Sequence, residues 1–134
     1  GIFRTKMVKP SGSGNMYCHP RYIEKRLTSL LKFVNEKLLI VNTQERIVLG
    51  CLFFSEFLLI HPFINGNGRT ARLLLSLFIK PPIPITFYSR SNQLYNSVLE
   101  DRLVNIDLPP IKLVNYLVKA INSSVANIHY QVVE

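Results

Sequence analysis

The segment His61–Arg72 constrains this chain most, because it places a polar, glycine-containing loop between two apolar stretches. The residues Ile47–Ile60 before it are nearly all apolar, and so are Leu73–Ile79 after it. Within the loop stand one His, two Asn, two Gly and two Arg. A polar loop held between two apolar helices is a typical layout for a functional loop.

Two glycines in this loop, Gly66 and Gly68, allow a sharp turn that brings backbone N–H groups close together at the start of the next helix. Such a helix N-terminus favours anions. Arg69 and Arg72 are three residues apart, so they share a helix face and can grip neighbouring phosphates. His61 stands where the preceding helix ends. The residues alone therefore predict a phosphate-binding loop with a proton acceptor beside it.

The composition predicts one globular domain over residues 1–134. Apolar residues make up 48% and charged residues 18%, which is typical of a chain that buries a core. The net charge of +8 suits anionic partners such as nucleotides, nucleic acids, acidic protein surfaces or membranes. A basic surface that is merely solvated explains the same charge, so charge alone selects no partner.

Cysteine usage favours a reducing compartment such as the cytoplasm. Cys18 and Cys51 are the two cysteines of the chain, and Cys51 lies inside an apolar helix, so no disulfide framework is expected. The first residues, Gly1–Arg4, do not read as a signal peptide. The apolar stretch Ile47–Ile60 has 14 residues and is too short to cross a bilayer, so we expect no membrane span.

The secondary structure is expected to be mainly helical with a short N-terminal hairpin. Residues 2–9 alternate loosely and predict a strand, residues 10–15 predict a turn, and residues 16–19 predict the return strand. Thr43 is the expected N-cap of the central helix, with Arg46 instead of an acidic residue three positions later. Apolar spacing predicts helices from Pro20 to Leu38, Gln44 to Ile60, Arg69 to Ile79, Ser91 to Val104, and Pro109 or Pro110 to about Tyr130.

The loop at residues 61–72 resembles the signature of the Fic family, His-Pro-Phe-x-(Asp or Glu)-Gly-Asn-Gly-Arg-x-x-Arg. The stretch Gly1-Ile2-Phe3-Arg4 with Val8 is similar to the family's Gly-x-Phe-Arg stretch, where the active-site flap lies. Tyr95 resembles a tyrosine that follows the motif helix. The resemblance implies a single Fic-type helical bundle with the flap at about 1–19, the loop at 61–68 and the motif helix at 69–79.

By this resemblance, the chain is expected to be an enzyme that transfers AMP from ATP to the hydroxyl of a Ser, Thr or Tyr in a target protein. His61 would take the proton of that hydroxyl, since histidine titrates near neutral pH. The hydroxyl oxygen would attack the α-phosphate, and pyrophosphate would leave. Some family members transfer other phosphate-containing groups, and modification of the chain itself is a further option.

The resemblance also assigns roles in substrate binding. Arg69 would hold the leaving phosphates, Arg72 would reach the terminal phosphate, and Tyr95 would line the adenine pocket. The backbone N–H groups that would cradle the phosphates belong to Gly66, Asn67 and Gly68. The flap residues that would align a target segment as an added strand are Phe3, Arg4, Thr5, Lys6, Met7 and Val8.

Asn65 departs from the family pattern, because it stands where the signature has the acidic residue that holds Mg²⁺. An amide oxygen can ligate Mg²⁺ or Mn²⁺ but brings no charge, and Mg²⁺ favours carboxylates and phosphates. Three readings stay open: weak metal binding with the nucleotide as the main ligand, a different donor, or nucleotide binding with little turnover.

A second departure concerns control. Many family members carry an inhibitory helix with a Ser/Thr-x-x-x-Glu-Gly/Asn pattern, and the glutamate of this helix pairs with the second arginine of the motif. Residues 1–134 contain no such pattern, so we expect Arg72 to be free of an internal carboxylate partner. The alternative to an enzyme is a nucleotide-binding module without turnover. Nucleic-acid binding is not favoured, because no aromatic platform interleaves with the basic residues.

Overall fold

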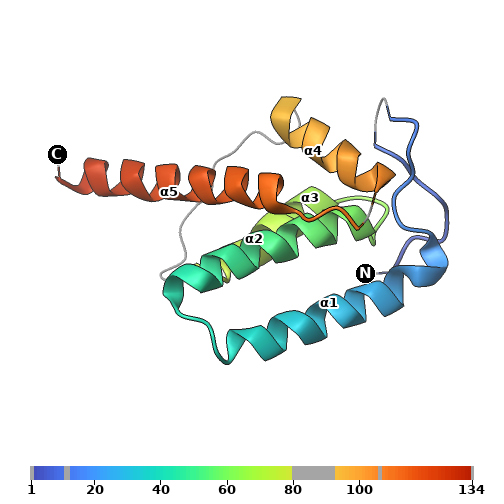
Figure 1. Ribbon diagram of the computed structural model, residues 1–134, viewed down its shortest axis with the longest axis horizontal. Coiled ribbons are helices and arrows are strands. Elements are labelled where there is room, and N and C mark those ends of the chain that lie inside the picture. Colours follow the sequence, from blue (N-terminus) through green and yellow to red (C-terminus); the bar gives the residue numbers. More distant parts are fainter. Residues whose placement is uncertain (1, 11–12, 80–92, 106, 134) are drawn as a thin grey trace.

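The computed structural model describes residues 2–10, 13–79, 93–105 and 107–133, and the regular structure in these ranges is helical (Figure 1). The mainly helical architecture predicted from the sequence is therefore confirmed. No helix in the described ranges is both long and apolar enough to span a membrane. In chain order the elements are the 3-10 turn η1 (Pro20–Tyr22) and the helices α1 (Ile23–Leu38), α2 (Thr43–Ile60), α3 (Asn67–Ser76), α4 (Gln93–Val104) and α5 (Ile111–Val133).

Helix α2 is the centre of the fold. It packs against α1, α3, α4 and α5, and Figure 1 shows α1 and α5 on opposite sides of it. Because it is surrounded, its sequence is apolar nearly all round instead of on one stripe. Gly50 marks a close approach to the segment that follows α3. A Cβ at Gly50 would lie 2.7 Å from Cβ and Cγ of Phe78.

The start of α2 differs by one residue from the prediction. Asn42, not Thr43, is the N-cap: its side chain accepts a hydrogen bond of 2.8 Å from the Glu45 backbone N–H. The Glu45 carboxylate in turn accepts a hydrogen bond of 3.2 Å from the Asn42 N–H. This reciprocal pair is a complete capping box, and it begins the helix one residue earlier than a Thr43 cap would.

Two polar residues interrupt the apolar part of α2, Ile47–Ile60, and both contact Arg102 of α4. Ser55 is fully buried, and its hydroxyl accepts a hydrogen bond of 3.2 Å from Arg102. Glu56 forms an ion pair with the same guanidinium group. Arg102 also donates to the backbone carbonyl of Leu108 at 2.9 Å. Since Arg102 is only 4% exposed, these partners offset the cost of burying its charge and fix α4 against α2.

The expected N-terminal β-hairpin does not form in the described residues, so this prediction is wrong. The two segments expected as strands, residues 2–9 and 16–19, are joined by one backbone hydrogen bond, from Tyr17 N–H to Val8 C=O at 2.9 Å. Between the two segments lies the side chain of Arg4, which donates to the carbonyls of Lys6 and Cys18, one on each segment. Those carbonyls are bound to a guanidinium group instead of to a strand partner, so no ladder extends. Two strands alone would in any case be marginally stable.

The other helices lie near their predicted positions. The expected helix at Pro20 opens as the 3-10 turn η1 before α1, and α3 begins two residues before Arg69 and ends three residues before Ile79. Helix α4 is described from Gln93, so residues 91–92 lie outside the described ranges. Helix α5 contributes fully buried residues at a four-residue spacing to the core against α2: Leu113, Leu117 and Ile121.

Replacing Gly50 with alanine tests the close packing of α2. The added methyl group would overlap Phe78 and approach Leu75 at 3.0 Å. Overpacking of this kind costs about 1–3 kcal/mol, and the better helix propensity of alanine returns at most about 1 kcal/mol. We therefore expect Gly50→Ala to lower the free energy of unfolding by about 1–2 kcal/mol in urea denaturation.

Gly14→Ala is the matched control, because a Cβ there would have no atom within 4 Å. Its free energy of unfolding should stay within about 0.5 kcal/mol of the parent chain. Equal stability of the two variants would contradict the packing described for Gly50.

Candidate active site

His61 ends α2 in the left-handed backbone conformation. Its φ and ψ are 50° and 61°, and its N–H still donates to the Phe57 carbonyl at 2.9 Å. A residue with a side chain rarely adopts this conformation, which costs about 1–3 kcal/mol and persists only where the surroundings hold it. The buried Pro62 follows and cannot continue the helix. The turn directs the chain from α2 into the loop that leads to α3.

The imidazole ring of His61 lies flat against the ring of Tyr17. The two centroids are 3.9 Å apart and the planes differ by 2°. Because the lone pair of an imidazole nitrogen lies in the ring plane, this stack covers one face of the ring but leaves its edge free of Tyr17. Nδ1 is buried and has no hydrogen-bond partner among the described residues, so the other nitrogen, Nε2, is the candidate proton acceptor.

The protonation state of His61 follows from its surroundings. Burial, and secondly the positive charge of Arg4, lower the pKa of His61 from 6.5 to about 4. Burial raises the pKa of the stacked Tyr17, and the nearby Glu100 raises it further, while Arg4 opposes this change. At neutral pH the pair therefore consists of a neutral imidazole beside a neutral phenol.

Asn67 holds the loop in shape from the first turn of α3. Its Oδ1 accepts a hydrogen bond from the Phe63 N–H at 3.0 Å, and its Nδ2 donates to the Phe63 carbonyl at 2.8 Å. The Asn67 side chain is buried, so these bonds are shielded from water. The Phe63 ring anchors the loop, with its centroid 5.9 Å from that of Phe3 and 6.4 Å from that of Phe57. Asn67 is thus a brace for the loop and not the cap of the helix.

The N-terminus of α3 brings two guanidinium groups over two glycines. Gly66 is the N-cap residue, with φ of 79°, and no side chain caps this end. A Cβ at Gly66 would lie 3.6 Å from Nη2 of Arg69, and a Cβ at Gly68 would lie 3.6 Å from Nη1 of Arg72. The uncapped N–H groups and the two cations together form a strongly electropositive surface. No carboxylate in the described part of the chain forms an ion pair with Arg72.

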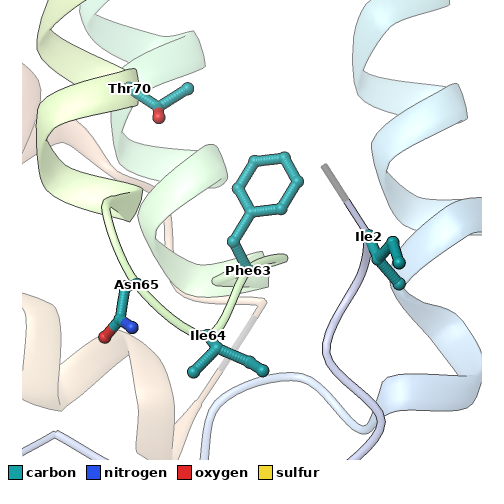
Figure 2. A pocket seen from close by; sticks show the side chains of 5 residues that line it. All are labelled: Ile2, Phe63, Ile64, Asn65 and Thr70. Carbon is teal, nitrogen blue, oxygen red and sulfur yellow. The ribbon is translucent and has the colours of Figure 1, made fainter.

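A shallow pocket of about 450 Å³ opens beside the loop. In Figure 2 the Phe63 ring stands between Thr70 of α3 and Ile2 of the N-terminal segment. Ile64 and Asn65 complete the lining, and both side chains are exposed. Asn65 makes no side-chain hydrogen bond within the described residues, so its amide group is open to a ligand.

The structure brings most of the predicted site residues to the junction of α2 and α3. His61, Asn65 and Gly66–Arg72 all lie there. Tyr95 belongs to α4, but its side chain lies outside the described residues. Of the expected flap, Phe3 packs on the loop, Val8 is half-buried, and three side chains are exposed: Thr5, Lys6 and Met7. Arg4 is instead buried and turned toward the end of α2.

Two features of the site were missed from the sequence. Tyr17, which we expected only as part of a return strand, stacks on His61. Arg4 acts inside the protein and not on its surface. Both residues are more than 40 positions from His61 in sequence, and no local spacing pattern links such distant positions. The resemblance of Gly1–Arg4 to a family stretch was the only signal that pointed at Arg4.

The comparison with family models decides the assignment. The model of the Fic/DOC family matches residues 1–79, which is more than half of the chain and includes the whole loop. The chain belongs to this family. The resemblance inferred from the loop is therefore confirmed.

Curated relatives within the Fic/DOC family are named as protein adenylyltransferases. The chain is 34% identical over 77 residues to protein adenylyltransferase fic-1 of Caenorhabditis elegans, which covers 54% of this chain and 15% of that protein. It is 29% identical over 80 residues to the probable protein adenylyltransferase y4lH of Sinorhizobium fredii. This match covers 58% of this chain and 42% of that protein. The chain thus spans less than half the length of these relatives.

Solved Fic structures share the fold. A Fic domain containing signaling protein of Bacteroides thetaiotaomicron matches with a TM-score of 0.71 and 25% identity over 93% of this chain and 52% of that one. The BepC protein of Bartonella tribocorum, solved with bound AMPPNP, matches with a TM-score of 0.62 and 21% identity. This match covers 85% of this chain and 56% of that one. The Fic fold therefore extends beyond the 79 residues matched by the family model.

Asn67→Asp tests the brace at the loop. The aspartate would still accept from the Phe63 N–H, but its second oxygen would face the Phe63 carbonyl without a proton between them. Leaving a buried polar group unpaired costs about 1–3 kcal/mol, so we expect this loss in the free energy of unfolding in urea. Asn65→Asp is the matched control in the same loop. Its exposed side chain should leave stability within about 0.5 kcal/mol, and equal losses would contradict the brace.

The low pKa of His61 predicts a specific dependence of stability on pH. An unfolded histidine takes up a proton near pH 6.5, whereas folded His61 does so only near pH 4. As the pH falls from 6.5 to 4, the unfolded state binds more protons and is favoured; above pH 7 the group contributes no pH dependence.

Urea denaturation at several pH values should therefore show that the parent chain loses more stability from pH 7 to 4 than His61→Gln does. The carboxylates titrate equally in both proteins, so the difference isolates His61. Parallel profiles would show that the folded imidazole titrates normally.

Proposed function

We propose that this chain transfers AMP from ATP to a hydroxyl group of a target protein. The observation that carries the proposal is the arrangement of one short loop, with the His61 imidazole at one end and the guanidinium groups of Arg69 and Arg72 over the glycines at the other. A base and a polyphosphate-binding surface are the two parts that such a transfer needs. The names of the relatives and the AMPPNP bound by the Bartonella protein support the choice of reaction and donor.

In the proposed reaction, His61 accepts the proton of the target hydroxyl. The hydroxyl oxygen forms a bond with the α-phosphorus of ATP, the bond from that phosphorus to the bridging oxygen of the β-phosphate breaks, and pyrophosphate leaves. With a pKa of about 4, the His61 imidazole of the nucleotide-free protein is neutral at pH 7 but only weakly basic. Negative phosphates bound nearby would raise this pKa toward the range in which a general base works best.

The phosphates of ATP would bind at the start of α3. Backbone N–H groups of Gly66, Asn67 and Gly68 are the donors there, and no side chain of the described residues caps them. Arg69 would hold the leaving phosphates and Arg72 the terminal phosphate. Guanidinium groups suit this task because their planar donors match phosphate oxygens. Bound in this way, the nucleotide would present its α-phosphate to the hydroxyl beside His61.

The target segment would lie along the exposed part of the N-terminal segment. Phe3, Thr5, Lys6 and Met7 are exposed there, and Val8 is half-buried. Backbone groups of such an extended segment can pair with a peptide as an added strand. Tyr95 remains the proposed residue of the adenine pocket.

The residues of the loop fit a metal ion only in a supporting role. Asn65 offers one neutral oxygen, and the described residues contain no group of three or more His, Cys, Asp or Glu that could hold an ion. Mg²⁺ usually keeps several waters and binds substrate phosphates, so water and the nucleotide would supply most of its ligands. Asn65 would hold Mg²⁺ or Mn²⁺ through its amide oxygen, and the ion would neutralise phosphate charge.

The same residue motivates a second candidate function. Asn65 is exposed, uncharged and free of side-chain hydrogen bonds within the described residues, so nothing compensates for the missing carboxylate. A site with this composition can bind nucleotide and turn it over slowly or not at all. Under this alternative the chain is a nucleotide-binding module with intact phosphate contacts.

One experiment separates the two candidates. The chain is incubated with ATP labelled at the α-phosphate, with Mg²⁺ or Mn²⁺ and with candidate proteins, its own copies included, while ATP binding is measured by calorimetry. We expect label on protein, a loss of about 10²–10⁴-fold in His61→Ala, and similar ATP affinity in that variant. ATP binding without label would support the module. Absence of both binding and label would remove both candidates.

Asn65→Asp then tests the departure in the loop. If the amide is a weak metal ligand, the carboxylate should raise the rate of label transfer and lower the concentration of Mg²⁺ at half-maximal rate. Asn65→Ala serves as the control, because it removes the oxygen without adding charge. A lower rate in Asn65→Asp than in the parent chain would show that the site is adapted to the amide.

A further inference from the structure

Arg4 is buried at the end of α2 and binds backbone groups from three places in the chain. Its side chain is 2% exposed. Nε donates to the carbonyl of His61 at 2.6 Å, and Nη2 donates to that of Ile60 at 3.1 Å. Nη1 donates to Lys6 at 2.9 Å, and Nη2 is also bonded to Cys18. The Arg4 backbone N–H adds a fifth contact, to Pro62 at 2.9 Å.

All four side-chain acceptors of Arg4 are neutral carbonyls. No carboxylate among the described residues forms an ion pair with it. Burying a cation without an anionic partner is costly, and burial lowers the pKa of Arg4. The carbonyls at the C-terminus of α2 offset part of this cost, because they lack intrahelical partners and carry the negative end of the helix dipole. The fold thus keeps a positive charge fixed beside His61.

We propose that Arg4 is a positioning residue of the site, whose guanidinium group holds His61 in its left-handed backbone conformation with the imidazole edge available to a substrate. This inference rests on the proposed role of His61 as the base. The bond from Nε to the His61 carbonyl, together with the backbone bond to Pro62, fixes the peptide group at which α2 turns into the loop. Lysine cannot replace this grip, since its ammonium is a single compact donor group.

The charge of Arg4 has a second effect on the same residue. Burial is the first cause of the low pKa of His61, and Arg4 is the charged group that adds to it. Tyr17 stacks on the imidazole, and Glu100 of α4 acts on Tyr17. Tyr17 is neutral at pH 7, so Arg4 is the charged group that acts directly on the imidazole. Like charge disfavours the imidazolium form. Arg4 therefore both places the ring and adds to burial, the larger cause, in keeping it unprotonated in the free protein.

The test follows the three histidine rings of the full chain by NMR as the pH is varied. His61→Gln identifies the His61 signal. In Arg4→Gln we expect the His61 midpoint to rise above 4, because the like charge is removed, but to stay below 6.5, because the burial remains. In a folded Arg4→Gln, an unchanged midpoint would remove the effect of charge, and an unchanged ring-current shift from Tyr17 would overturn the positioning role.

Arg4→Lys separates position from charge and carries the test if Arg4→Gln does not fold. It keeps a cation but loses the forked grip, so the ring-current shift that Tyr17 imposes on His61 should shrink while the midpoint stays low. Transfer of α-labelled AMP should fall in kcat with little change in KM for ATP. A His61 ring shift and kcat equal to those of the parent chain would reject a positioning role.

The NMR readouts need no enzymatic activity, so the two proposals fail separately. Shifted His61 signals in a chain that transfers no label would remove the adenylyltransferase and leave Arg4 as the residue that positions His61. Unshifted signals with normal transfer would leave the enzyme and remove the role of Arg4. Thr5→Ala is the matched control on the exposed side of the same segment, and its His61 titration should equal that of the parent chain.

Discussion

Helix α2 has no room to slide, because it is packed on all sides by α1, α3, α4 and α5. Gly50 meets the Phe78 side chain so closely that a methyl group does not fit between them. Well-packed interiors resist displacement because every shift costs contacts on one side and creates overlap on the other. The last turn of α2 is therefore a fixed reference point, and the position of His61 relative to α3 follows from it.

The arginines near the site divide into two groups with opposite solvation. Arg4 is buried, and four of its five side-chain N–H donors are bound to carbonyls of the protein. Arg69 is exposed and Arg72 half-buried, with both guanidinium groups resting over glycine backbone. A guanidinium group whose donors are already used can orient its neighbours but cannot bind a ligand, whereas one that faces solvent can. Arginine thus serves two purposes here: Arg4 holds the backbone at the start of the loop, whereas Arg69 and Arg72 offer donors to a ligand.

The helices and the loop were predictable from the sequence because their signals are local. Apolar spacing and the residues 61–72 lie within a few turns of chain, and they led to the correct family and a mainly helical fold. The capping residue was misplaced by one position, since Asn42 and Thr43 are both good N-caps and the glutamate that decides between them is Glu45. The hairpin and the Tyr17 stack depend on contacts between distant segments, which no local pattern encodes.

Asn65 stands in a different relation to the fold from its neighbour Asn67. Asn67 is tied by two hydrogen bonds to the loop, whereas the Asn65 side chain has none within the described residues and faces solvent. Exchange at an exposed side chain without partners usually changes stability little. The residue at position 65 can therefore change between asparagine and aspartate without unfolding the protein. The fold thus leaves the residue type at position 65 adjustable independently of the scaffold that presents it.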